Sequence, residues 1–225
     1  MIVAFEVVIT LIFLGLLVWS VKYGSTACLG SLLGGYFLSG FDWLWCTAGF
    51  WNATFNSELT MIPGLNIQGI TYPYTIGFLW AIGFGLLPLI VSKYYETLRM
   101  YLGRLHFPVI FAGAVLTDMV VEIICVHWLG LWTYHQSPKF LLFSWNWSNA
   151  WFLGGILTAS YYGMAYARKW GVLSDAAGFS LSSETIWKGL FVPTALILTP
   201  AAIITPLQLF WFSAMTPWIT SGRPF

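Results

Sequence analysis

Residues 117–134, TDMVVEIICVHWLGLWTY, place two acids, Asp118 and Glu122, inside an apolar segment long enough to cross a bilayer. An ionised carboxylate is costly in hydrocarbon and is rarely kept there without a function. Helix positions four apart differ by about 40° of rotation, so both acids share one face. Trp128, Trp132 and Tyr134 follow where the helix should leave the hydrocarbon, a depth that amphipathic rings favour. The stretch therefore predicts a buried acid pair below an aromatic rim.

The composition indicates an integral membrane protein with a single domain, residues 1–225. The chain is 59% hydrophobic and only 8% charged, whereas globular chains carry about 25% charged residues. A net charge of +1 gives no indication of a nucleic-acid partner. The surroundings expected for such a chain are membrane lipids, in the endoplasmic reticulum of a eukaryote or the cytoplasmic membrane of a bacterium. Cys28, Cys46 and Cys125 lie in or beside apolar segments without CxxC spacing, which predicts small buried side chains and no disulfide framework.

Hydrophobic runs of about 20 residues predict an all-α, polytopic bundle of membrane helices. Six such runs occur, at residues 3–21, 26–47, 73–92, 107–128, 149–167 and 187–212. The last run is overlong and contains Pro193, Pro200 and Pro206, so it is expected to be kinked, or split so that residues 211–218 form a seventh, short span. Six helices are expected, with seven as the alternative.

Lys and Arg predict the orientation. With the N-terminus on the non-cytoplasmic side, seven of these residues fall in inner loops and two in outer ones: Lys22, Lys93, Arg99, Arg104, Arg168, Lys169 and Lys188 against Lys139 and Arg223. The N-terminal run lacks a basic start and carries Glu6, so we interpret it as the first membrane helix and not as a signal peptide.

Two long outer connections are expected to fold back over the bundle as a lid. They are residues 52–72 and the tryptophan-rich residues 129–148. Both are too apolar for free loops. On the inner side, Ser182 or Ser183 followed by Glu184 is expected to begin the last helix.

The topology places the membrane acids at or beyond mid-depth, toward the outer face. Asp118 lies about 16 Å and Glu122 about 22 Å from the inner end of their helix, and Asp42 about 24 Å from the inner end of its own. Glu6 lies near a helix start, where a carboxylate meets interfacial water or the positive helix end. Structural alternatives remain for the others: Asp42 as a partner for a backbone or tryptophan N–H, and Asp118 with Glu122 as a pair that satisfies itself.

Carboxyl groups in an aromatic pocket are suited to general acid catalysis on a lipophilic molecule. Burial disfavours the ionised form, so one carboxylic acid can protonate an alkene, epoxide, carbonyl or hydroxyl while another carboxylate removes a proton at the end. Tryptophan and phenylalanine faces stabilise a carbocation by cation–π attraction, about 2 kcal/mol or more per desolvated ring.

Absent motifs narrow the chemistry. The sequence has no DDxxD-type cluster to hold magnesium against a diphosphate, no HExxH, no GxSxG and no glycine-rich phosphate loop. His106, His127 and His135 are too few and too scattered for a strong metal site. We therefore expect no cofactor and no metal. A retinal-binding pump is not expected, because Lys188 lies at the inner edge of the last helix.

The pattern Asp118-x-x-x-Glu122 followed by Gly130-x-Trp132-x-Tyr134 resembles small polytopic enzymes of terpenoid and polyketide tailoring. The C-terminal half is similar to membrane carotenoid hydratase and cyclase proteins, although Ile123 stands where those proteins carry a proline. The chain also resembles the spirocyclases of avermectin-type biosynthesis, with Asp42 and Asn52 as the upstream Asp and Asn, and more loosely the integral membrane meroterpenoid cyclases. The resemblance implies acid-driven cyclisation or hydration of a lipophilic chain without a cofactor.

These observations predict a membrane cyclase that acts on a terpenoid or meroterpenoid. A hydratase or dehydratase with the same site, and a lipid-binding or transport protein whose acids carry protons, are the alternatives. The expected catalytic carboxyls are Asp118, Glu122 and Asp42, with the choice of first proton donor left open. The residues expected to contact the substrate are Trp43, Trp45, Trp128, Trp132, Tyr134, Trp151 and Asn52.

Overall fold

The computed structural model describes residues 1–47, 53–67, 69–135, 141–142, 145–173, 175 and 182–220, and most of these residues are helical. The helical elements are α1 (Ile2–Lys22), α2 (Thr26–Trp45), α3 (Tyr74–Trp80), the π-helix η1 (Ala81–Leu86), α4 (Leu87–Ser92), α5 (Tyr95–Leu102), the 3₁₀-helix η2 (Gly103–Leu105), α6 (His106–Glu122), the π-helix η3 (Ile123–Trp128), α7 (Trp147–Lys169), α8 (Ser183–Ile186), the π-helix η5 (Trp187–Phe191) and α9 (Val192–Thr220). The strands are β1 (Ala53–Phe55), β2 (Met61–Ile67), β3 (Ile70–Pro73), β4 (Trp132–Tyr134), β5 (Leu141–Leu142) and β6 (Trp145–Asn146).

Helix α2 is the centre of the bundle because its small residues admit neighbouring backbones. A Cβ on Gly35 would lie 2.7 Å from the Ala81 Cα of η1, and a Cβ on Gly30 would lie 2.3 Å from the Gly189 carbonyl oxygen of η5. Such close approach is a common way for membrane helices to associate. On the α9 side, the Trp45 indole donates a hydrogen bond to Thr205 Oγ1 at 3.0 Å.

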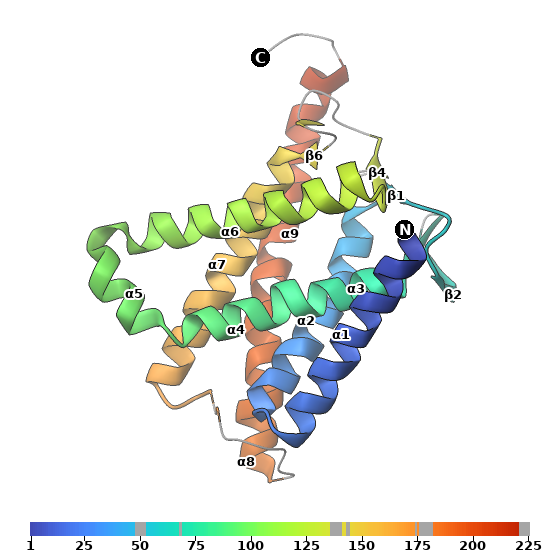
Figure 1. Cartoon of the computed structure of the whole chain (residues 1–225). Coiled ribbons are helices and arrows are strands. Elements are labelled where there is room, and N and C mark those ends of the chain that lie inside the picture. The colour runs from blue at the N-terminus through green and yellow to red at the C-terminus, as the bar shows by residue number, and fades with distance from the viewer. Residues whose placement is uncertain are drawn as a thin grey trace.

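The helices form a closed ring in which α2 packs on η1, α4 on α7, α7 on α9 and α9 on α2. Helix α6 packs chiefly on α7, outside this ring. Figure 1 shows the rod of α3, η1 and α4 and the rod of α6 as separate elements, joined at one end by α5. The turn from α5 into α6 uses Gly103 at a φ of +52°, a conformation that side chains other than glycine rarely adopt.

Four helical stretches of the described residues are long and apolar enough to cross a membrane: Ile2–Lys22, Tyr74–Ser92, Tyr95–Trp128 and Ser183–Trp211. Two further helices, α2 with 20 residues and α7 with 23, have the length but a more polar composition. The expected all-α class is therefore confirmed, each of the six expected runs coincides with a helical segment, and the four long apolar helices are compatible with a membrane protein.

The last helix is not split, so a seventh, short span at residues 211–218 is not present. Helix α9 continues as one α-helix from Val192 to Thr220. Prolines are tolerated in membrane helices where hydroxyl side chains and neighbouring helices satisfy the released carbonyls. Here Thr194 donates to the Leu190 and Gly30 carbonyls at 2.7 and 2.9 Å, and Thr205 donates to the Ala201 carbonyl at 2.7 Å, so hydroxyl donors lie next to Gly189 and Ala202, whose carbonyls lose their N–H donors to Pro193 and Pro206. The expected start of the last segment is correct, since Ser182 Oγ accepts the Thr185 N–H of α8.

The two outer connections fold together, as expected of a lid. Strands β1 and β4 pair antiparallel, with Phe55 opposite Trp132 and Ala53 opposite Tyr134. The Asn56 side-chain amide donates to the Gly130 carbonyl at 2.9 Å and strengthens this connection. Strands β2 and β3 form a second antiparallel pair beside it.

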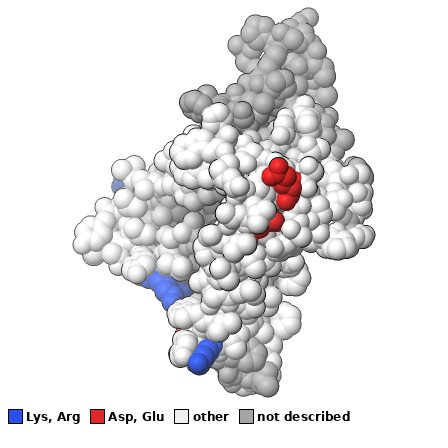
Figure 2. All heavy atoms as spheres, turned by 45° about the vertical axis from the view of Figure 1, so that its right-hand side comes forward, with Lys and Arg blue, Asp and Glu red and all other residues white. Residues whose placement is uncertain are grey.

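Most of the face shown in Figure 2 is uncharged, with Lys and Arg toward the lower and left edges and Asp and Glu toward the upper right. At the basic end, Arg168 of α7 donates to Ser92 Oγ and to the Leu89 carbonyl of α4 and pairs with Asp175. This network fixes the end of α4 against the end of α7.

Candidate functional site: an acidic, aromatic cavity under the lid

One cavity of about 690 Å³, its open mouth included, lies between the α3–η1 rod and α6. Its back wall comes from α2 and α7, and strands β1 and β4 close it on the lid side. Three of its lining side chains are carboxyls and most of the others are apolar. The lining residues are Asp42, Cys46, Phe55, Ile76, Leu79, Trp80, Gly83, Phe84, Thr117, Asp118, Val121, Glu122, Trp132, Tyr134, Leu153 and Leu157.

Helix periodicity explains which residues reach the cavity. On α6 the lining positions are 117, 118, 121 and 122, which form one stripe on the helix surface. On α3 and η1 they are 76, 79, 80, 83 and 84, again at spacings of three and four. The predicted shared face of Asp118 and Glu122 is therefore present, and α2 brings Asp42 to the same cavity.

The Asp42 carboxyl is held by a tyrosine from the lid region. The Tyr72 hydroxyl of β3 donates to Asp42 Oδ2 at 2.6 Å, and both side chains are buried. The Trp80 indole N–H also faces this carboxyl. Asp42 and Asp118 are close enough to repel each other when both are ionised. Protonation of one of these two carboxyls therefore relieves the repulsion between them.

The Glu122 carboxyl is paired in the same way. The Tyr134 hydroxyl of β4 lies 2.8 Å from Glu122 Oε1 and 2.9 Å from Oε2. This contact requires the chain to reverse after the helix, and Gly130 makes the turn at a φ of +62°. The π-helix η3 begins at Ile123, directly after Glu122, and π segments are frequent at functional sites. Two tyrosine and carboxyl pairs, one from α2 and one from α6, thus share the cavity.

Asp118 differs from the other two acids. Its side chain is 5% exposed, and its Oδ2 atom is buried with no hydrogen-bond partner among the described residues. A buried carboxyl oxygen without a partner is unfavourable unless another molecule satisfies it. Asp118 lines the cavity with its other atoms, since this oxygen is itself buried.

Two groups of aromatic rings lie around the carboxyls. Trp80 stacks on Phe84 with ring centroids 4.3 Å apart, and Phe55 meets Tyr72 edge to face at 5.0 Å and Trp132 at 6.4 Å. These faces carry negative charge density and attract a cation. The cavity combines acids with surfaces able to stabilise positive charge.

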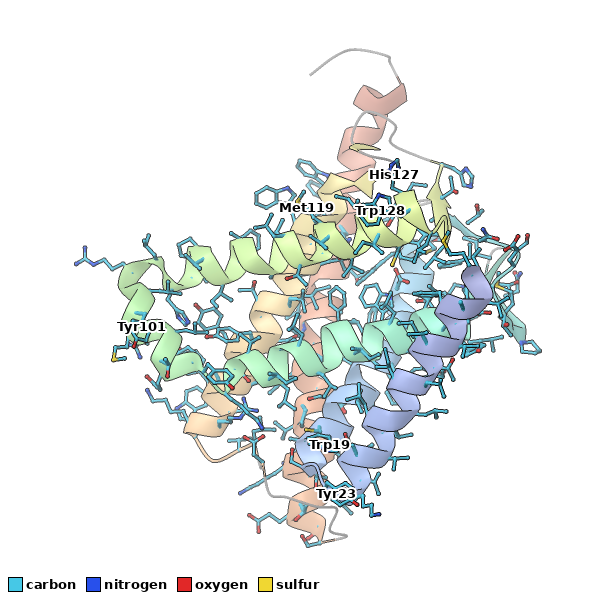
Figure 3. The ribbon with its side chains drawn as sticks, viewed as in Figure 1. Trp19, Tyr23, Tyr101, Met119, His127 and Trp128 are labelled. Atoms are coloured by element: carbon cyan, nitrogen blue, oxygen red, sulfur yellow. The ribbon has the colours of Figure 1, made fainter. Side chains whose placement is uncertain are left out.

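Four expected cavity residues lie elsewhere, and helix rotation is the reason. Trp43 and Trp45 flank the Asp42 and Cys46 stripe of α2: the Trp43 indole donates to the Ile70 carbonyl at 2.8 Å, and Trp45 is fully buried against α9. Trp128 is 68% exposed at the lid end of η3, where Figure 3 shows it beside His127. Trp151 is 51% exposed, because it lies about 200° around α7 from the lining residue Leu153.

Of the other residues expected to contact a substrate, Trp132 and Tyr134 line the cavity, whereas Asn52 lies outside the described residues. Glu6 belongs to a separate contact: its carboxylate accepts the Thr60 N–H at 2.9 Å and the Thr60 and Thr75 hydroxyls at 3.1 and 3.3 Å. It links α1 to the lid region and to α3.

Sequence reasoning missed Phe55, Tyr72, Trp80 and Phe84. Phe55 and Tyr72 come from a long connection whose fold depends on pairing with residues far along the chain. Trp80 and Phe84 occupy one face of a run that is apolar all round, so periodicity alone does not distinguish them. Their spacing to Ile76 would have grouped them on one face, without showing which face meets the acids.

Comparisons with protein-family models, curated proteins and solved structures found no match for this chain. The functional argument therefore depends on the cavity itself.

Proposed function

We propose that this protein is an integral membrane cyclase that protonates and cyclises a lipophilic terpenoid or meroterpenoid without a metal. The observation that carries the proposal is the convergence of Asp42, Asp118 and Glu122, from two separate helices, on one aromatic cavity. Isolated structural acids would not need to converge on one cavity, and a metal site would not need its aromatic walls.

In this proposal Asp118 is the proton donor. Its carboxylic acid proton is transferred to a terminal alkene carbon or epoxide oxygen, and the resulting cation is attacked by a second alkene, so that a carbon–carbon bond forms. Asp42 or Glu122 then removes a proton from the carbon next to the final cation, leaving a carbon–carbon double bond. The proton gained equals the proton lost, so the reaction is an isomerisation, and exchange among the carboxyls restores Asp118.

Tyr72 and Tyr134 support the assignment of Asp118 as the acid and of Asp42 or Glu122 as the base. A carboxylate that accepts a tyrosine O–H is stabilised as a base, and both Asp42 and Glu122 accept one. Asp118 has an oxygen free of such a contact among the described residues. The aromatic faces of Trp80, Phe84 and Trp132 stabilise the cation between the two proton transfers.

We further propose that the chain crosses the membrane six times with its N-terminus on the non-cytoplasmic side. The basic end also carries exposed aromatic side chains, including Trp19 and Tyr23 at the end of α1 and Tyr101 on α5, which Figure 3 labels. The centroid of the Tyr23 ring lies 5.0 Å from Lys22 Nζ. The exposed Trp128 lies at the opposite end of the molecule. Tryptophan and tyrosine favour both membrane interfaces, and Lys and Arg favour the cytoplasmic one. The acid cavity then lies in the outer half of the membrane.

The test expresses the full chain in microsomes and supplies prenylated and terminally epoxidised substrates. Product formation by the wild type is compared with that of Asp42→Asn, Asp118→Asn and Glu122→Gln, with the exposed acid variant Glu58→Gln as the control. We expect each cavity variant to lose turnover and the control to retain it. Full turnover by all three cavity variants would show the proposal to be wrong.

The same experiment separates the rival functions. A cyclic product with the mass of the substrate supports the cyclase. Incorporation of ¹⁸O from labelled water indicates a hydratase, and saturable binding without conversion indicates a lipid-binding or transport protein.

A further inference from the structure

A second cavity adjoins the acid cavity, on the side nearer the Lys- and Arg-bearing end of the molecule. No charged residue lines it. It encloses about 610 Å³, open sides included, between α4 and α6, with α7 as its floor. Helix α4 contributes Leu87 and Val91, and α6 contributes Ile110 and Gly113. We call this space the α4–α6 groove.

The groove adjoins the acid cavity. Thr117 of α6 and Leu157 of α7 line both spaces. Helices α4 and α6 each pack on α7, whereas they have few contacts with each other. A molecule can therefore extend from the carboxyls along the groove, and the space between α4 and α6 is a side entrance to it.

The chemistry of the lining suits a hydrocarbon chain. The Thr117 hydroxyl donates to the Gly113 carbonyl of its own helix at 2.8 Å. The Tyr161 hydroxyl, at the far end, pairs with His106 Nε2 at 2.8 Å. These two hydroxyls already have partners, whereas the buried Thr158 Oγ1 of the same lining has none among the described residues. The other lining residues are apolar, so the groove offers mainly dispersion and hydrophobic contacts.

Small residues leave the groove open on the α6 side. A Cβ built on Gly113 would meet no heavy atom within 4 Å, which means that the space beside it is empty. The next residue, Ala114, also lines the groove. Along α6, the distance from Glu122 to the groove residue Val109 is about 20 Å at 1.5 Å per residue. A chain with its reacting end at the carboxyls can extend along this whole length.

We propose that the α4–α6 groove binds the unreacted part of an extended isoprenoid chain, which enters sideways from the bilayer, and that the groove sets the chain length the protein accepts. This inference depends on the proposed cyclase function, because the acid cavity must hold the reacting end. It identifies the substrate class as a long, linear polyprenyl chain and not a compact terpenoid.

Three glycines with open space beside them provide a matched test. Gly113 lies in the groove, Gly83 in the acid cavity, and Gly15 on the exposed part of α1, and an added Cβ meets nothing within 4 Å at any of them. Each is replaced by Phe in full-length protein in microsomes. Turnover is measured with terminally epoxidised geranyl, farnesyl and geranylgeranyl chains.

We expect Gly113→Phe to lower turnover of the geranylgeranyl chain at least about tenfold relative to the geranyl chain, because the added ring occupies the groove. Gly83→Phe should lower turnover of all three chains, and Gly15→Phe should change none. Gly113→Leu, with a smaller side chain, should give an intermediate loss. If Gly113→Phe leaves the chain-length profile unchanged, or lowers all chains equally, the groove does not hold the chain.

Crosslinking provides a readout that does not need turnover. A geranylgeranyl chain with a diazirine at the end away from the epoxide is irradiated in the same microsomes, and labelled peptides are identified by mass spectrometry. We expect labels on the α4 and α6 segments that contain Val91 and Ile110, reduced in Gly113→Phe. Labels elsewhere, or equal labelling by a diazirine phosphatidylcholine that the prenyl chain does not compete away, would overturn the groove proposal.

The two proposals fail in different ways. If groove labelling is specific but Asp118→Asn retains full turnover, the acid mechanism is wrong and the groove stands as a binding site. If Asp118→Asn is inactive but Gly113→Phe turns over the three chain lengths in the same ratio as the wild type, the cyclase proposal stands and the groove proposal is wrong.

Discussion

Replacing Tyr134 by Phe removes one hydroxyl from the acid cavity and leaves the ring in place. That hydroxyl lies 2.8 and 2.9 Å from the two oxygens of Glu122, and both side chains are buried. Removing a hydrogen bond to a charged group costs about 1.5–3 kcal/mol. If Glu122 accepts the final proton, the carboxylate needs this donor before the transfer, and turnover should fall about tenfold to about a hundredfold.

Turnover is measured in microsomes at equal amounts of folded protein, with Tyr95→Phe as the matched control. Tyr95 is also a buried tyrosine, and its hydroxyl donates to the Tyr166 hydroxyl at 3.2 Å, away from the acid cavity. The control should retain wild-type turnover. Equal turnover by Tyr134→Phe and the wild type would refute a role for the Tyr134–Glu122 pair in proton transfer.

Three further predictions concern the lid, the helix packing and the absence of a metal requirement. Glu6→Ala should lower stability by about 1–3 kcal/mol, since the Thr60 N–H loses its acceptor, and thermal unfolding in detergent checks this; Glu6→Gln, which keeps an acceptor oxygen, should lose less. Gly35→Leu should destabilise the fold by about 1–3 kcal/mol, because its Cβ would lie 2.7 Å from the backbone of η1, whereas Gly40→Leu has open space and should melt like the wild type. Exhaustive chelation should leave turnover unchanged, and a loss of activity that magnesium restores would contradict the metal-free mechanism.

Hydrophobic run length was sufficient to predict the helices, because bilayer thickness and helical rise determine how long each must be. The acid pair was predictable for a similar reason: Asp118 and Glu122 lie four positions apart on one helix, and local geometry alone places them together. Asp42 reaches the same cavity through tertiary packing, which its own segment does not encode. The continuous α9 was not predictable from its prolines, since its course also depends on threonine hydroxyls and on packing against α2 and α7.

Trp43 and Trp45 show that closeness to an acid in sequence does not predict which rings line the cavity. Trp43 and Trp45 are sequence neighbours of Asp42, but a helix turns each of them about 60–100° away from its face. Tyr72, by contrast, lies 30 positions from Asp42 and provides its closest hydrogen bond. Proximity in sequence favoured aromatics that do not line this cavity, whereas Phe55 of the lid and Trp80 and Phe84 of the α3–η1 rod do line it.

The most direct measurement is the initial rate of Asp118→Asn in microsomes on a substrate that the wild type converts. Asn keeps the size of the side chain but has no acidic proton to donate. Because general acid catalysis contributes about 10²–10⁴-fold, we predict a loss of at least about a hundredfold, with Glu58→Gln unchanged. A rate for Asp118→Asn within about twofold of the wild type would contradict proton donation by Asp118, since a general acid contributes far more than that.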